Sequence, residues 1–464
     1  MGIRDEPGHR EAAVPPPAVG AAGWWARWRS DVLLAIVVLL LVAPVLQPLM
    51  AQQASRYALT AALWDARSIA LDDYEHLLSV DRAEHDGRVL SDKAPGQPLV
   101  GVPAYALYRG LGGHPATNAQ VFGDPGLWAV TFVSAMLPAA LLAVAMRRLA
   151  LRVVPRRATH AALALAVASL LLPFGTVLFS HVLAALLGLV AYLVLTAEDG
   201  PRAWRLVAAG ALAGAAVSVE YTAGIVAVTV MVVAAVSWGV RALWVAVGGA
   251  GPATLLGIYH TLAFGGPLQT GYRHSEFAHL HAEGFMGVGR PEAGTLFAVL
   301  AGERGLLLLT PVVLVGSIGL VALAVRGGSG RRDALVGLAV LTAFVLLMSG
   351  WGNPTGGASP GPRYITVALP FLAGGVAWAW ERMPVAGWAA ALVGAATMGL
   401  ATFTQPLMPR TETALVAWWE RLAEGRTAQS WLTEATGSSV ALLLPVVAAL
   451  ALAAWLLARE RVRA

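Results

Sequence analysis

The stretch VLLAIVVLLLVAPVLQPLM, residues 32–50, decides the class of this protein. Its 19 residues carry no charge, and a helix needs roughly 20 apolar residues to cross a hydrocarbon core of about 30 Å. The composition agrees, because 57% of the 464 residues are hydrophobic and 13% are charged, against about 25% charged residues in a soluble domain. The sequence therefore predicts an all-α integral membrane protein, and it excludes the collagen-like, disordered and disulfide-bonded secreted classes.

Twelve apolar runs predict a polytopic bundle of about 12 transmembrane helices. They lie near residues 32–50, 126–145, 158–172, 181–197, 205–219, 221–237, 242–262, 304–325, 333–350, 364–380, 385–402 and 439–458. Residues 1–31 contain three consecutive prolines and then a tryptophan-rich segment. We expect them to form a disordered cytoplasmic tail and an interfacial anchor ahead of a transmembrane domain at 32–464.

The distribution of charge predicts the orientation. One set of alternate loops, together with both tails, holds 19 basic and 9 acidic residues, and the other set holds 13 basic and 18 acidic residues. Because arginine and lysine concentrate on the cytoplasmic side, both termini are predicted to be cytoplasmic. Three long loops, 51–125, 263–303 and 403–438, are then outside. The net charge of +5 thus reflects topology and does not predict nucleic-acid binding.

These outer loops have their own apolar patterns. Leucines and isoleucine at helical spacing between Leu59 and Leu78 predict one or two amphipathic helices that lie along the membrane. Segment 98–108, PLVGVPAYALY, is too short to span the membrane and is interpreted as re-entrant or interfacial. A stripe at 415–422 predicts a further amphipathic helix. In the fifth apolar run, Gly210 and Gly214 form a GxxxG motif that is typical of close helix packing.

Four carboxylates of the first outer loop are candidate catalytic groups: Asp65, Asp72, Asp73 and Asp81. An aspartate at headgroup depth can accept a proton from an acceptor hydroxyl or hold a divalent cation such as Mg²⁺ or Mn²⁺. Asp72 and Asp73 are adjacent and cannot both face the same way on a helix. Asp72 is the first choice for the base because it precedes Tyr74 close to the interface. The alternative for each carboxylate is a solvated helix face.

Lys93 is the only lysine among 32 basic residues, and it follows Asp92. An ammonium is a compact point charge that suits a phosphate oxygen or a neighbouring carboxylate. We therefore expect Lys93 to bind phosphate and Asp92 to orient it through an ion pair. The alternative is a surface Asp-Lys turn.

Two later positions add charge close to the outer interface. Glu220, followed by Tyr221, stands between two apolar runs, where an acid is a functional candidate or a carboxylate wetted at the interface. Arg363 follows the glycine- and proline-rich segment 351–362. Its guanidinium offers a fork to phosphate oxygens, although a snorkelling interfacial arginine is the alternative.

The segment YRHSEFAHLHAEGF, residues 272–285, contains three histidines and two glutamates. Their order fits no zinc pattern such as HExxH, so a polar, substrate-facing loop is favoured over a metal site. The sequence contains no P-loop, no GxSxG elbow and no cysteine. Nucleotide hydrolysis, serine-hydrolase chemistry and thiolate chemistry are therefore without support.

Five short motifs, taken together, resemble those of bacterial GT-C glycosyltransferases of the family 39 type. They are SDKAPG at 91–96, VPAYAL at 102–107, FGGPLQTGY at 264–272, ERGLLLLTP at 303–311 and GPRY at 361–364. The resemblance implies a GT-C-like membrane enzyme of the bacterial inner membrane, with its active site on the outer face. Such an enzyme takes a sugar from a polyprenyl-phosphate carrier, uses an aspartate of the first outer loop as base, and inverts the anomeric centre.

The resemblance also implies roles for individual residues. The donor phosphate would be bound by residues that neutralise or orient charge: Lys93, Asp92, Arg363, Arg273 and Arg304. The substrate would contact a second set of polar and aromatic residues: Glu220, Tyr221, Tyr272, His274 and Tyr364. The family places an acidic pair directly after its first span, whereas Asp65 and Asp72 lie deeper in the loop here.

Two readings from other classes remain open. Twelve spans with an acid such as Glu220 also suit a lipid or sugar transporter or flippase. A non-catalytic partner in cell-envelope assembly would leave the carboxylates of the first loop replaceable. Polar residues gather in the outer loops and not in mid-membrane, which favours the transferase, with a glycan, lipid or protein as acceptor.

Overall fold

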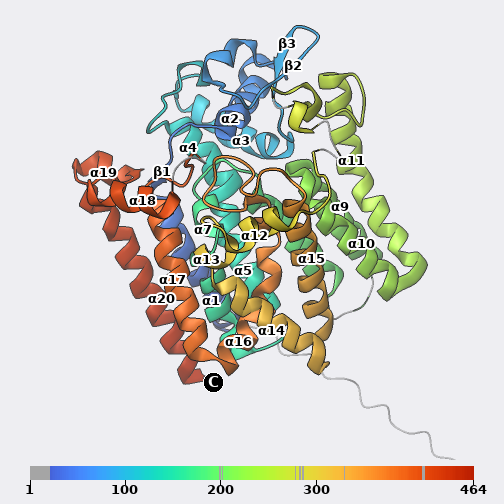
Figure 1. Ribbon diagram of the computed structural model, residues 1–464, viewed down its shortest axis with the longest axis vertical. Helices are drawn as coiled ribbons and strands as arrows, with labels where there is room; N and C mark the ends of the chain where they lie inside the picture. The colour runs from blue at the N-terminus through green and yellow to red at the C-terminus, as the bar shows by residue number, and fades with distance from the viewer. Residues whose placement is uncertain are drawn as a thin grey trace, which may run out of the picture.

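The computed structural model describes residues 21–197, 200, 202–276, 278–281, 284, 287–328, 330–409 and 413–463. The predicted disordered tail at 1–20 lies outside them. In the described part, long helices stand side by side along the longest axis, and a layer of shorter elements covers one end (Figure 1). The chain terminates at the opposite end (Figure 1). The prediction of an all-α membrane protein is confirmed, apart from two small sheets.

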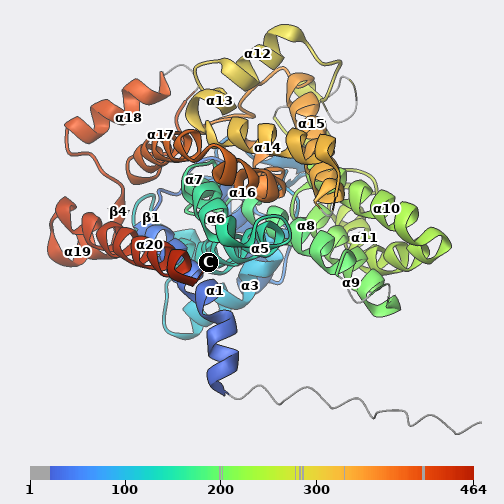
Figure 2. The ribbon, with the colours of Figure 1, turned by 90° about the horizontal axis from the view of Figure 1, so that it is seen from below.

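Each predicted apolar run contains at least one helix. In chain order these are α1 (Ala21–Val42), α4 (Pro125–Thr131), which continues into α5 (Leu137–Leu151), α6 (Ala158–Val167), α7 (Leu171–Phe174), α8 (His181–Leu195), α9 (Ala203–Val219), α10 (Gly224–Trp238), α11 (Leu243–Phe264), α13 (Leu306–Leu309), α14 (Val312–Arg326), α15 (Arg331–Ser349), α16 (Ala373–Arg382), α17 (Pro384–Phe403) and α20 (Leu443–Arg463). Seen along the bundle, α5 and α6 lie near the centre and α10 at the rim, and α20 runs from the rim toward the centre (Figure 2). Small and apolar side chains of these helices form the main buried core.

The predicted count of twelve crossings stays a prediction. Five helical stretches among the described residues are long and apolar enough to cross a membrane, and α12 (Ala293–Ala301) and α13 would add a sixth together with α14, although the pair is bent by 96°. One of the five, Tyr221–Phe264, contains both α10 and α11, which a turn at Gly239 (φ 55°) separates. Helices α6 and α16 have 10 residues each, about half the usual length of a span.

Glycines bring α9 and α11 into close contact, as the GxxxG motif predicts. A Cβ on Gly210 would lie 1.9 Å from the carbonyl oxygen of Val245, and one on Gly248 would lie 1.9 Å from that of Val207. No side chain fits at these distances, so the two backbones meet only because glycine stands at both positions.

Arginines at the end that carries the C-terminus are paired with acids. Arg147 of α5 lies 2.7 Å from Asp31 of α1 and 3.2 Å from Glu460 of α20. Arg156 and Arg157 both pair with Glu381 of α16. Segments that the sequence assigns to the cytoplasm therefore contact one another at one end of the bundle.

The first long loop forms the layer at the other end. It contains α2 (Gln52–Ala61), the 3₁₀ segment η2 (Asp72–Leu77), the hairpin β2 (Ala83–His85) and β3 (Arg88–Leu90), and α3 (Gly96–Gly110). All ten residues of α2 are buried. The stretch predicted to be amphipathic, residues 59–78, shares only its first three residues with α2 and continues as Ala62–Ala66 and η2, and its position along the membrane stays a prediction. Helix α2 is buried although it contains Gln52, Arg56 and Tyr57, whereas α3, the segment interpreted as re-entrant or interfacial, exposes Leu99 and Leu107.

A second, two-residue sheet joins distant parts of the chain. Strand β1 (Val45–Leu46) pairs with β4 (Gln429–Ser430) in antiparallel register. The predicted amphipathic helix of the third loop is present as α18 (Ala414–Ala423), with Trp418 buried and Trp419 exposed. The short α19 (Trp431–Thr436) follows β4. This sheet fixes the third loop to the end of α1.

Candidate active site

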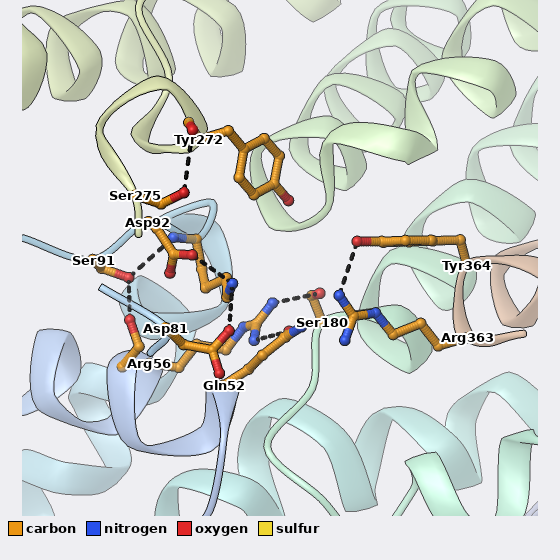
Figure 3. A network of polar contacts seen from close by, with 12 residues as sticks. Gln52, Arg56, Asp81, Ser91, Asp92, Ser180, Tyr272, Ser275, Arg363 and Tyr364 are labelled. Atoms are coloured by element: carbon orange, nitrogen blue, oxygen red, sulfur yellow. Dashed lines mark hydrogen bonds and ion pairs between the residues drawn. The ribbon is translucent and has the colours of Figure 1, made fainter. Parts of the chain in front are cut away.

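Lys93 lies in a buried group of charges that includes Asp81, Asp92 and Arg56, which Figure 3 shows close together. Its ammonium lies 2.8 Å from Asp81 Oδ1 and 2.6 Å from Asp92 Oδ2. The expected ion pair with Asp92 is therefore present, and Asp81 adds a second carboxylate. Lys93 is 7% exposed and Asp92 1%, which excludes the alternative of a surface turn.

These three groups influence one another's ionisation. Burial opposes the ionisation of Asp81, but Lys93 outweighs it, so the pKa of Asp81 lies below its ordinary value. For Asp92, burial prevails over Lys93 and raises the pKa. Burial alone would lower the pKa of Lys93, yet the two carboxylates together raise it. At neutral pH the ammonium and the Asp81 carboxylate are therefore charged.

Two glycines position this group. Ser91, Asp92 and Lys93 join β3 to the first turn of α3. A Cβ on Gly96 would lie 2.5 Å from the Ser218 carbonyl oxygen, and one on Gly271 would lie 2.6 Å from Cα of Asp92. The motifs SDKAPG and PLQTGY therefore need their glycines so that α9 and the segment after α11 can close around Lys93.

Arg56 of α2 is a second buried cation in this group. It donates from Nη1 to Gln52 Oε1 at 2.7 Å and from Nη2 to Ser180 Oγ at 3.0 Å. The Ser180 hydroxyl in turn donates to Glu220 Oε2 at 2.6 Å. His181 Nδ1 lies 3.4 Å from the same carboxylate oxygen. Glu220, 4% exposed, is thus a buried acid and not a wetted one.

Arg363 approaches from the opposite side of Ser180 (Figure 3). It is 8% exposed and donates from Nη2 to the Tyr364 hydroxyl at 3.0 Å. The Tyr364 ring stacks on Trp351 with centroids 4.9 Å apart. This burial excludes a snorkelling role for Arg363.

Aromatic side chains close the group on a further side. The Lys93 ammonium lies 6.0 Å from the centroid of the Tyr272 ring, and this ring meets Tyr221 edge to face at 5.7 Å. The Tyr221 hydroxyl lies 2.8 Å from His260 Nε2. The predicted substrate residues Tyr221, Tyr272 and Tyr364 therefore lie around the same charged group as Glu220.

Other candidate residues lie elsewhere. Asp65 accepts hydrogen bonds from the Tyr105 hydroxyl at 2.6 Å and from Arg109 Nε at 3.0 Å. Asp72 is exposed and accepts a hydrogen bond from the backbone N–H of Val89 at 3.3 Å. Asp73 is exposed as well. Of the four candidate bases, the structure brings only Asp81 next to Lys93.

Two arginines and a histidine that were predicted to lie at the site form their contacts with other residues, away from Lys93. Arg304 donates to the carbonyl oxygens of Ser359 and Met408, both at 3.1 Å, and so joins loops of the backbone. Arg273 is exposed, and it donates to Gln269. The His274 ring stacks on Phe264 with centroids 5.3 Å apart. Their predicted roles toward the donor and substrate have no geometric support in these contacts.

Sequence reasoning missed Arg56 and Ser180. Arg56 is the only charged residue between positions 32 and 64, and this isolation in an apolar stretch was a usable signal. Ser180 gave none, because one serine in an apolar run is common. Within the described ranges, no three His, Asp or Glu side chains are grouped to hold a metal ion, and part of the histidine-rich segment, including Glu283, lies outside those ranges.

This fold is similar to that of ArnT. The structure of ArnT from Cupriavidus metallidurans in the apo state matches with a TM-score of 0.50 and 16% identity over 95% of this chain and 78% of that chain. ArnT from the same organism bound to undecaprenyl phosphate gives a TM-score of 0.48 and 16% identity over 96% and 78%. No family model and no curated protein matches the sequence. The likeness concerns the fold, and it agrees with the predicted GT-C architecture.

Proposed function

We propose that this protein is a membrane glycosyltransferase of the GT-C, family 39 type. It moves a sugar from a polyprenyl-phosphate carrier to a hydroxyl of a glycan, lipid or protein. The observation that carries the proposal is the ion pair of Lys93 with Asp81 in a buried site beneath the first long loop, where the charge of Arg363 also favours the ionised Asp81 carboxylate. The fold shared with ArnT supports it at the level of architecture.

In this proposal, Lys93 and Arg363 bind the donor phosphate and Asp81 is the base. The acceptor oxygen attacks C1 of the sugar from the face opposite the phosphate, and the bond between C1 and the phosphate oxygen breaks with its electron pair on that oxygen. The acceptor proton passes to the Asp81 carboxylate. The configuration at C1 inverts, and polyprenyl phosphate leaves.

Donor binding would also activate the base. In the free protein, Lys93 lies 2.8 Å from Asp81 and is the main charge that favours the ionised carboxylate. A phosphate that takes the ammonium removes part of this interaction, so the Asp81 carboxylate becomes more basic when the donor is bound. Proton acceptance is thereby coupled to the presence of the donor.

Purified protein in detergent tests the proposal. Given a polyprenyl-phosphate sugar and acceptor extract, it should release polyprenyl phosphate without a sealed compartment, and Asp81→Asn should abolish the release. Asp72→Asn is the matched control, because it makes the same chemical change in the same loop away from Lys93. Activity that appears only as movement of the lipid across liposomes would support the transporter and refute the transferase.

We propose the bacterial inner membrane as the location, with both termini cytoplasmic and the site outside. The chain has no cysteine. A single cysteine placed in loop 51–125, 263–303 or 403–438 therefore shows on which side of the membrane that loop lies. Such cysteines should react with an impermeant reagent in intact cells, and cysteines near Arg156 should react only after lysis. The reverse pattern would place the site in the cytoplasm.

A further inference from the structure

Helices α14 and α16, which lie side by side (Figure 2), each end with an arginine at the same level of the bundle. A Cβ on Gly319 of α14 would lie 2.0 Å from the carbonyl oxygen of Gly375 of α16, so the two backbones are in contact there. Arg326 follows Gly319 by seven residues, and Arg382 follows Gly375 by the same number, which is about two turns of helix. The Arg326 guanidinium lies 5.0 Å from the centroid of the Trp378 ring of α16, so the two helices run in the same direction.

The positive charge near these helix ends is not matched by the acids described close to it. Two acids there are each shared between two other arginines: Glu381 between Arg156 and Arg157, and Asp333 between Arg152 and Arg332. Arg326, Arg331 and Arg382 are exposed, and none of them forms an ion pair or a side-chain hydrogen bond with another residue of the described part. Three positive charges are therefore available to an anion at this end.

An exposed apolar face of α14 ends next to Arg326. Leu314, Ile318, Val321 and Val325 are between 45% and 82% exposed. They are spaced by four, three and four residues, so they lie on one face of the helix, and we call this face the apolar stripe. A molecule that contacts both the apolar stripe and the arginine beyond it needs an apolar chain and an anionic head.

Arginine at a helix end also has an effect that needs no ligand. Arg326 and Arg382 both lie in the last turn of their helices, where a cation stabilises the partial negative charge of the C-terminus. This effect is the same in every lipid and does not involve the apolar stripe. A dependence on the charge of the lipid headgroup therefore separates a lipid site from a helix-end effect.

We propose that Arg326 and Arg382 bind the headgroup of an anionic phospholipid such as phosphatidylglycerol, with an acyl chain along the apolar stripe. Tryptophan prefers the boundary between hydrocarbon and headgroups, and Trp378 lies one turn before Arg382, which places both arginines at headgroup depth. Arginines there attract anionic lipids, whereas the phosphate of phosphatidylcholine is neutralised by its own ammonium group. The inference does not depend on the proposed function, because it concerns the end of the bundle opposite to Lys93.

A titration of the full chain in detergent tests this inference, with dioleoyl phosphatidylglycerol and dioleoyl phosphatidylcholine as probes and the melting temperature as readout. At low salt the wild type should bind the anionic lipid at least about 10-fold more tightly, since two arginines attract its charge. In 1 M NaCl the preference should fall below about 3-fold, because the Debye length is then about 3 Å. Inorganic phosphate should not displace the lipid, because it has no chain for the apolar stripe, and displacement would indicate a site for free anions and overturn the proposal.

Substitution of the two arginines gives the sharper comparison. Arg326→Gln and Arg382→Gln should each lower the preference for the anionic lipid about 5-fold, as expected for one charge near a membrane surface, and the double variant should bind both lipids alike. Lysine at both positions keeps the charges and should keep most of the preference. The melting temperature without added lipid reports the helix-end effect separately.

Arg67→Gln is the matched control, because Arg67 is an exposed arginine that stacks on Trp64 at 4.6 Å in the first long loop, at the other end of the bundle. It should leave the ratio of the two affinities unchanged. Equal affinities in the wild type, or an unchanged ratio in the folded double variant, would overturn the inference. A dimer that forms through the apolar stripe without any lipid preference would assign this face to a second copy of the chain and overturn it as well.

Discussion

Two groups of arginines at opposite ends of the bundle differ in whether they form direct ion pairs. At the end with the C-terminus, Arg147, Arg148, Arg156 and Arg157 each pair with an acid. Under the first long loop, Arg56 and Arg363 are buried, their Nε atoms lack an acceptor, and the described residues form no direct ion pair with them. Paired charges hold helices together, whereas these two arginines belong to a buried group that also contains Lys93 and the acids Asp81, Asp92 and Glu220. The comparison separates arginines that join two helices through one direct ion pair from arginines that share a buried polar site.

The largest expected effect is on turnover in Asp81→Asn. Asparagine retains the shape of the side chain but cannot accept the acceptor proton, and loss of a positioned base commonly costs about 10² to 10⁴ in rate. Donor binding should persist, because Arg363 and Lys93 remain. The measurement is kcat with donor affinity determined separately, and retention of more than a tenth of the wild-type kcat would assign the base elsewhere.

Arg363→Gln should have the next largest effect. Removal of one preorganised donor to a developing charge typically costs about 10² to 10³ in rate, and here donor binding should weaken too. Arg363→Lys should recover only part of the activity. Lysine restores the positive charge, but its ammonium lacks the planar donor fork of a guanidinium. If Arg363→Gln changes only the thermal stability, the buried arginine belongs to the architecture after all.

The sequence predicted the helices and the centre of the site, but it did not predict every residue of the site. Apolar runs located the helices, and the lone Lys93 next to Asp92 located the centre of the site. The choice of Asp72 over Asp81 has no geometric support, because the hairpin between β2 and β3 turns the chain back and places Asp81 beside Lys93. Glu220 was a candidate from the sequence, but its hydrogen bond with Ser180 forms only because the start of α8 and the end of α9 meet in the fold, which no local pattern predicts.

At the other end of the bundle, Asp31→Asn should reduce stability and spare catalysis. Asp31 is 3% exposed and pairs with Arg147 and Arg148, so its neutralisation leaves two cations partly unsatisfied. We expect a loss of about 1–3 kcal/mol in the free energy of unfolding and near wild-type kcat in the folded protein. Thermal unfolding in detergent measures the first and the release assay the second, and a selective fall in kcat would break the comparison.

The ion pairs of Lys93 predict a modest dependence of stability on pH. The pKa of Asp81 is lowered in the folded protein, so its contribution is present above about pH 4, the unfolded value, and is lost as the pH falls through the folded pKa. The pKa of Lys93 is raised, so its contribution is lost as the pH rises above about 10.4. In Asp81→Asn, the melting temperature should therefore fall less steeply as the pH is lowered than in the wild type. An equally steep fall in both proteins would contradict the lowered pKa of Asp81.

The smallest effect is expected for Asp72→Asn, the residue that the sequence alone favoured as base. Asp72 is exposed, and its recorded contact is the Val89 N–H at 3.3 Å. The side-chain oxygen of asparagine can accept the same hydrogen bond, so both stability and turnover should change less than about 2-fold, as at most surface positions. The same assay run on Asp72→Asn and Asp81→Asn therefore compares one chemical change at two sites of one loop. A severe loss at Asp72 with normal turnover at Asp81 would move the reaction away from Lys93 and toward the exposed end of the first long loop.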